Sequence, residues 1–128
     1  MLKKIRDNLY VADKKVTKAQ LTKAKISVVV VAADKFTFEG LPNNCIYFSI
    51  SLRRAQVNRP HVKDIACHIP KYMVQSGERV AIISPGGVVR AAWVAARAVC
   101  EMEDKTIYEI FQELAETLPG FKIGEAYL

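Results

Sequence analysis

The chain has 128 residues, of which 51% are hydrophobic and 25% charged, and its formal net charge is +6. That is enough chain for one domain whose core needs neither a disulfide nor a structural metal. No apolar run approaches the roughly 20 residues of a membrane-spanning helix, and the first residues lack a signal-peptide pattern, so we expect no membrane association and no export. The three cysteines are an odd, widely spaced set, which favours reduced thiols in the cytoplasm or nucleus.

The excess positive charge lies in the first 25 residues, which carry eight Lys or Arg against two Asp, while the rest of the chain is balanced. A nucleic-acid interface would use these side chains as phosphate contacts. Only Tyr10 is interleaved with them, which is too few aromatic rings for base stacking. We therefore favour a solvated basic face over nucleic-acid binding. The side chains concerned are Lys3, Lys4, Arg6, Lys14, Lys15, Lys18, Lys23 and Lys25.

The first half of the chain predicts three strands and one short helix. Residues 9–12 read as a short strand, and Thr17 with Gln20 has the spacing of a capping box that opens a helix. Residues 26–32 are almost continuously apolar and β-branched, as expected for a central strand covered on both faces. A loop rich in Gly, Pro and Asn follows, and residues 46–52 form the third strand.

A longer helix is predicted next, with Pro60 in its first turn and Gly77 at its end. We expect Pro70 to bend or interrupt it, because proline lacks the N–H that a helix interior uses. Its apolar positions recur at helical spacing. They are Val62, Ile65, Ala66, Ile69 and Met73.

The second half predicts one more strand and two helices. Residues 79–83 form the strand, residues 85–87 the turn, and an apolar stripe marks a helix from residue 89 to 102. Thr106 opens the last helix with a second capping box, and Pro119 with the following Gly ends it. Strands alternating with helices predict a single α/β domain over residues 1–128, with a mostly parallel central sheet of four or five strands flanked by helices. Such sheets bind ligands beyond the carboxyl ends of their strands.

The turn after the last strand has the composition of an anion-binding loop. A strand-to-helix turn presents backbone N–H groups and the positive end of the helix dipole. Glycines let these N–H groups turn inward, and an Arg at the helix start adds a bidentate fork for phosphate or sulfate. The turn matches neither the dinucleotide-binding fingerprint nor the phosphate loop of nucleotide hydrolases. The candidate binding residues are Ser84, Gly86, Gly87, Val88, Val89 and Arg90.

This order of strand, six-residue step, Arg and buried helix resembles the Cys-x5-Arg signature of the protein tyrosine and dual-specificity phosphatases. Gly87 and Arg90 match its Gly and Arg. The resemblance extends over nearly the whole chain and implies a compact dual-specificity-phosphatase-like domain. Similar segments are residues 5–11, 26–32, 47–50 and 118–123.

Four departures from that signature remove the chemistry that the resemblance would imply. Ser84 stands where the family has its nucleophilic cysteine, Ile83 replaces the preceding histidine, and Ala91 replaces the hydroxyl residue after the Arg. The stretch 51–58, where the family carries its general acid, has no Asp or Glu. A serine without an adjacent base is a poor nucleophile. We interpret the chain as a catalytically inactive pseudophosphatase with a scaffolding or phosphoprotein-binding role in signalling.

The expected ligand is a phosphorylated protein or a small oxyanion, with no cofactor. Arg53 and Arg54 are candidate rim residues, whereas Pro85 removes one N–H from the loop. Two alternatives stay open. The chain is an active phosphatase in which Ser84 replaces the cysteine by design, or it is a structural subunit whose basic N-terminal segment contacts RNA or an acidic partner.

A metal site is the weakest candidate, and we expect none. Three polar side chains, His61, Asp64 and His68, lie at helical spacing with Cys67 beside them. Structural zinc needs three or four ligands at established spacings, so solvated helix residues explain this group better. Asp64 is also the nearest carboxylate to the missing general acid, but it falls within the predicted helix.

Overall fold

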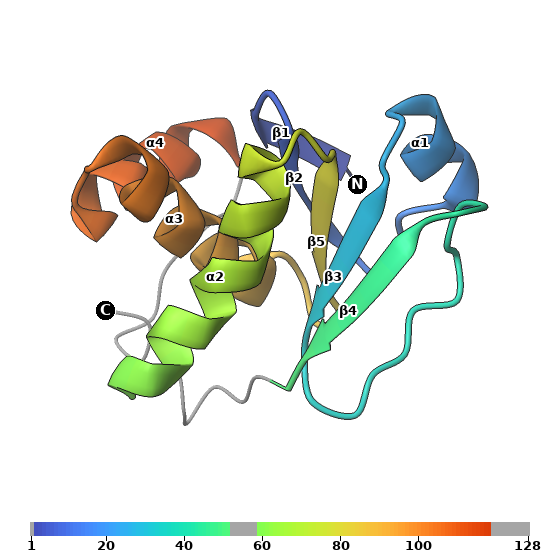
Figure 1. The fold of residues 1–128 in the computed structure, drawn as a ribbon, viewed down its shortest axis with the longest axis horizontal. Helices are drawn as coiled ribbons and strands as arrows, with labels where there is room; N and C mark the ends of the chain where they lie inside the picture. Colours follow the sequence, from blue (N-terminus) through green and yellow to red (C-terminus); the bar gives the residue numbers. More distant parts are fainter. Residues whose placement is uncertain (1, 52–58, 119–128) are drawn as a thin grey trace.

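A five-stranded sheet forms the centre of the computed structural model, which describes residues 2–51 and 59–118, the side chain of Lys63 excepted. The strand order is β1-β2-β5-β3-β4 (Figure 1). Four strands are parallel, and β1 pairs antiparallel with β2 at one edge. The bounds are β1 Leu2–Arg6, β2 Leu9–Asp13, β3 Val28–Ala32, β4 Ile46–Ile50 and β5 Val80–Ser84. The prediction of an α/β domain with a mostly parallel sheet is confirmed.

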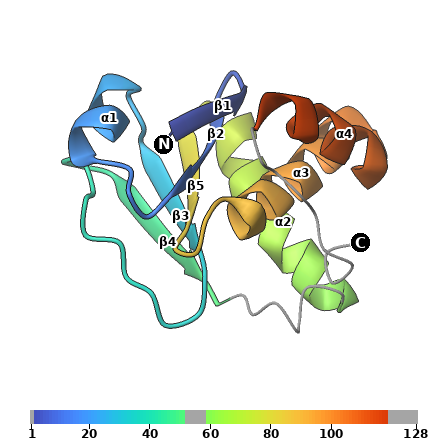
Figure 2. The same ribbon diagram turned by 180° about the vertical axis from the view of Figure 1, so that it is seen from behind.

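Helices cover both faces of this sheet. Three of them, α2, α3 and α4, lie together on one face, and the short α1 lies on the other (Figures 1 and 2). None of the helices in the described ranges is long and apolar enough to cross a bilayer. The bounds are α1 Lys18–Lys23, α2 Pro60–Gln75, α3 Val89–Glu103 and α4 Ile107–Thr117.

The sheet divides the core into two layers, because successive side chains of a strand point to opposite faces. In β3 and β5 every residue is buried, as a strand covered on both sides requires. Val28, Val30, Val80 and Ile82 pack on the side of α2, α3 and α4. Their neighbours in sequence pack on the side of α1, with Leu21 and Phe38.

Side-chain capping explains where α1 and α4 begin. The Thr17 side chain accepts from the Gln20 N–H and the Gln20 side chain accepts from the Thr17 N–H, so the predicted capping box of α1 is confirmed. At α4 the Thr106 hydroxyl accepts from the Glu109 N–H at 3.3 Å, which is the first half of the second predicted box. Gly77, at φ +88°, follows the end of α2, as predicted.

The structure differs from the sequence predictions at two elements. Pro70 does not interrupt α2, which runs unbroken from Pro60 to Gln75. Packing of this helix against α3 and the sheet compensates for the N–H that Pro70 lacks. The strand β1 is not among the predicted elements, because Ile5 is the one buried residue of its Lys-rich sequence. Charged side chains on an edge strand are common, since they discourage pairing with another chain.

The basic N-terminal segment is also more than a solvated face. Arg6 donates from Nε to Glu103 at 2.6 Å and from Nη1 to Glu113, which ties β1 to α3 and α4. These two carboxylates raise the pKa of Arg6, and Arg6 in turn lowers the pKa of Glu103. One of the eight basic residues is therefore a structural cross-link.

Candidate functional site

The strands β2 and β5 end side by side at the carboxyl edge of the sheet, where Asp13 is the register partner of Ser84. Four residues, 85–88, separate the end of β5 from the start of α3, so this turn lies directly beyond that edge. The next alternate position after Val80 and Ile82 is Ser84, which therefore points toward α3. The topology thus brings the predicted loop to the edge where parallel sheets bind ligands.

The Ser84 side chain is held inside the loop and is only 1% exposed. Its hydroxyl donates to the Gly87 carbonyl at 2.5 Å and accepts from the Ala91 N–H at 3.2 Å. The first N–H groups of a helix have no partner within the helix, so Ser84 satisfies one of these donors from outside it. Ser84 therefore closes the turn and caps α3.

The two glycines of the loop have different roles. Gly87 adopts φ +122°, a conformation that other residues rarely take, so the turn depends on glycine there. Gly86 has no positive φ, and a Cβ built on it would meet no atom within 4 Å. The predicted need for glycine therefore holds at Gly87 alone. Pro85 lies between Ser84 and Gly86 in the sequence. It is half-buried and has no N–H to donate.

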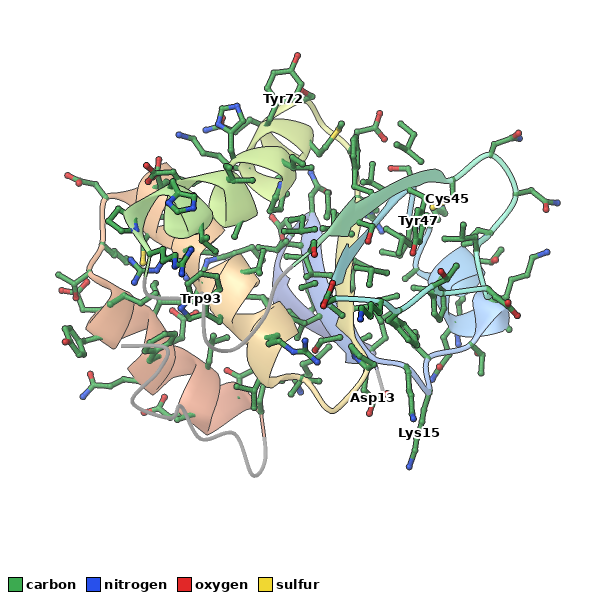
Figure 3. All side chains as sticks on the ribbon, turned by 90° about the horizontal axis from the view of Figure 1, so that it is seen from below. Asp13, Lys15, Cys45, Tyr47, Tyr72 and Trp93 are labelled. Atoms are coloured by element: carbon green, nitrogen blue, oxygen red, sulfur yellow. The ribbon has the colours of Figure 1, made fainter. Side chains whose placement is uncertain are left out.

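The turn borders a hollow of about 250 Å³ whose other wall comes from the end of β2 and the two residues that follow it. This wall consists of Asp13, Lys14 and Lys15, which face Pro85, Gly86 and Gly87. Figure 3 shows Asp13 and Lys15 together at this end of the molecule.

Asp13 and the two lysines give this hollow mixed charge. The Asp13 carboxylate accepts from the Lys15 N–H at 3.0 Å, and both lysine side chains are exposed. Asp13 is not among the predicted site residues, although a carboxylate at the end of a parallel strand lies at the ligand-binding edge. Lys14 and Lys15 were assigned to a separate basic face, whereas the fold brings them to the loop.

The remaining candidates around the loop are placed as follows. Val88 is the residue before α3, Val89 and Arg90 are its first two residues, and all three side chains are half-buried. Trp93 is fully buried, and the Arg97 guanidinium lies 5.7 Å from the centre of its ring. The predicted rim residues Arg53 and Arg54, with the rest of the stretch 52–58, lie outside the described residues.

The predicted polar group on α2 does not join this site. His61, Asp64 and His68 are exposed, and no cluster of three ligating side chains that would hold a metal occurs in residues 2–51 and 59–118. Cys67 is 4% exposed, and burial with the nearby Glu101 raises the pKa of its thiol to about 11. A thiol with that pKa is protonated at neutral pH and is a poor nucleophile.

Known proteins resemble this chain in three-dimensional structure, whereas the sequence comparisons found no match. No protein-family model matches the chain, and no curated protein is significantly similar to it. Solved structures do match. Human DUSP28 superposes with a TM-score of 0.81 over 98% of this chain and 86% of its own, at 14% identity. The human tyrosine phosphatase-like serine/threonine/tyrosine-interacting protein gives 0.79 over 98% and 89%, at 15% identity.

A third match is a mouse putative dual-specificity phosphatase complexed with zinc tungstate, with a TM-score of 0.82 over 98% of this chain and 80% of its own, at 12% identity. Identities this low show the fold alone. The chain therefore has the fold of the dual-specificity phosphatases, which confirms what the resemblance of its sequence implied.

Proposed function

We propose that this protein is a non-catalytic phosphate-binding module, which recognises a phosphorylated protein segment at the loop of Ser84–Arg90 and acts as a scaffold. One observation carries the proposal. The hydroxyl at the nucleophile position is used within the loop, where it holds Gly87 and caps Ala91. A hydroxyl that is held between two backbone groups shapes a binding loop.

The contacts of Ser84 support the absence of phosphoryl transfer. Its hydroxyl donates to a backbone carbonyl, which cannot take up a proton as the carboxylate or imidazole beside a catalytic serine does. The positions that flank the loop are the buried apolar residues Ile83 and Ala91. Asp64, the nearest carboxylate to the missing general acid in sequence, lies on α2 and borders hollows that do not include the loop.

Anion binding is supported by the position of the loop at the start of a 15-residue helix. The positive end of that helix and its first N–H groups favour a bound phosphate. Lys14 and Lys15 add positive charge across the hollow, whereas Asp13 opposes it. Tungstate is a tetrahedral oxyanion like phosphate, and the mouse protein of the same fold was crystallised with it.

A reducing compartment suits this proposal. Cys45, Cys67 and Cys100 are all free thiols. Burial raises the pKa of each, which keeps them in the thiol form. We place the protein in the cytoplasm or nucleus, where thiols stay reduced.

The test is a calorimetric titration of the protein with a phosphotyrosine peptide, a phosphoserine peptide and their unphosphorylated forms. We expect the phosphorylated forms alone to bind, and Arg90→Ala to weaken binding about tenfold or more, as for a charge-assisted contact. Glu116→Gln, on the exposed surface of α4, is the control. Equal affinity for phosphorylated and unphosphorylated peptides would remove the proposal.

A second assay separates this function from that of a phosphatase whose cysteine was replaced. Phosphate release from an aryl phosphate is measured for the parent and for Ser84→Cys. We expect no turnover from either, because Ile83 and Ala91 leave the restored thiol without the family's His and hydroxyl. Turnover by Ser84→Cys would establish the alternative of an active phosphatase.

A further inference from the structure

Two adjoining hollows lie on the outer side of α2, away from the loop. One, of about 240 Å³, has an almost wholly apolar surface and is lined by Asp64, Ile65, His68 and Ile69. The other, of about 370 Å³, lies between α2 and α3 and is lined by Asp64, Cys67, Arg97, Cys100, Glu101 and Asp104. Since Asp64 borders both, they form one surface, which we call the α2 face.

The α2 helix exposes two large hydrophobic side chains to solvent. Ile65 is 58% exposed, and Tyr72, seven residues later and so on the same side of the helix, is 61% exposed. Figure 3 shows the Tyr72 ring projecting outward from α2. Of these two side chains Ile65 lines the apolar hollow, and an exposed apolar side chain beside a hollow marks an interaction surface more often than an isolated one does.

The acidic part of the α2 face lies at the negative end of a helix dipole. Asp104 is the C-cap of α3, and the last turn of this helix contains no basic residue. Carboxylates are unfavourable there, because the helix C-terminus already carries partial negative charge. A cation that binds at this point relieves the repulsion.

Two of the carboxylates are available for such a cation. Glu101 pairs with Lys71 at 3.1 Å. Within the part of the chain that the structure describes, Asp64 and Asp104 take part in no ion pair. Arg97 also lines the hollow and opposes part of this charge. The local charge is therefore negative on a chain whose net charge is +6.

We propose that the α2 face docks a segment of a partner protein that carries an aliphatic side chain close to an Arg or Lys. The aliphatic side chain enters the hollow beside Ile65, and the cation lies between Asp64 and Asp104. Arg suits the second position best, since its planar fork reaches two carboxylates and is weakly hydrated. Complementary charge across such a surface selects the partner and sets its orientation.

The experiment uses fluorescein-labelled Gly/Ser peptides that each carry one Leu and one Arg, either adjacent or separated by one, two or three glycines. Binding to the full chain is followed by fluorescence anisotropy. We expect the best peptide to lose affinity about fivefold or more when its Arg becomes Glu, or its Leu becomes Gly. Asp64→Asn and Asp104→Asn should each weaken binding about threefold to tenfold. Glu116→Gln makes the same charge change on α4 and should have no effect.

Several results would overturn this inference: no binding by any peptide, equal binding by the Arg and Glu peptides, or equal binding by Asp104→Asn and the parent. Sedimentation velocity tests the remaining occupant, a second copy of the chain. A dimer that Ile65→Ser abolishes would assign the α2 face to self-association and refute the peptide proposal. Phosphate binding at the Ser84 loop is unaffected by every one of these outcomes.

Discussion

Removing the Ser84 hydroxyl should destabilise the whole domain, because this hydroxyl holds the turn between β5 and the start of α3. Ser84→Ala leaves the Ala91 N–H without its acceptor and the Gly87 carbonyl without its donor. Ala91 is fully buried, so water cannot replace the first of these bonds. A buried polar group left unpaired costs about 1–3 kcal/mol, and loss of a helix cap costs about 0.5–2 kcal/mol.

These two ranges describe largely the same lost contact, so we expect a decrease of about 2 kcal/mol in the free energy of unfolding. For a domain of this size that lowers the melting temperature by roughly 6–10 °C. The stability of Ser84→Cys should lie between those of the parent and Ser84→Ala, because a thiol is a weaker hydrogen-bond donor and acceptor than a hydroxyl.

Urea unfolding measures this effect with an internal probe. Trp93 is the single tryptophan and is fully buried, so its fluorescence reports loss of the core. Ser49→Ala is the matched control, since it removes the hydroxyl of an exposed serine on β4. If Ser84→Ala were as stable as the parent to within about 0.5 kcal/mol, the hydroxyl would not cap α3 and our interpretation of the loop would be wrong.

Three further predictions follow from the same contacts. Gly87→Ala should destabilise the protein by about 1–2 kcal/mol because of its φ of +122°, while Gly86→Ala should stay within about 0.5 kcal/mol of the parent; equal effects in urea unfolding would contradict the assigned turn. Asp13→Asn should strengthen phosphate binding several-fold, because it removes a negative charge from the hollow, and unchanged or weaker binding in calorimetry would place the anion elsewhere. Arg6→Gln should cost about 1 kcal/mol at neutral pH. Because Arg6 lowers the pKa of Glu103, that contribution is present above the usual carboxyl pKa of about 4.3 and is lost as pH falls through the lower folded value, so a parent-to-variant difference that stays constant into acid would refute the pairing.

Much of the fold could be predicted because local signals agreed with the tertiary structure. The apolar run of residues 26–32 could only be a covered strand, and β3 occupies Val28–Ala32 within it. The Thr17 capping box fixed the start of α1. By contrast, β1 depends on pairing with β2 and on Arg6 reaching two acids nearly a hundred or more positions away. No local pattern contains that information.

The candidate site, like the fold, could be predicted only in part. The spacing from Ser84 to Arg90 located the loop, which lies between β5 and α3 in the structure. The hydrogen bonds of the Ser84 hydroxyl could not be predicted, since they depend on how Gly87 turns its carbonyl inward. The hollow gains Asp13, Lys14 and Lys15 because β2 is the neighbour of β5 in the sheet. The order of strands in a sheet cannot be predicted from local sequence patterns.

The most direct test of the central claim is a phosphate titration of ¹⁵N-labelled protein, followed through the amide resonances of Gly86, Gly87 and Val88. If the loop is an anion receptor, these amides should shift together and saturate with one dissociation constant, and Arg90→Ala should weaken that constant. The account would be contradicted if the loop amide resonances did not shift at millimolar phosphate, whether or not resonances elsewhere in the protein shifted.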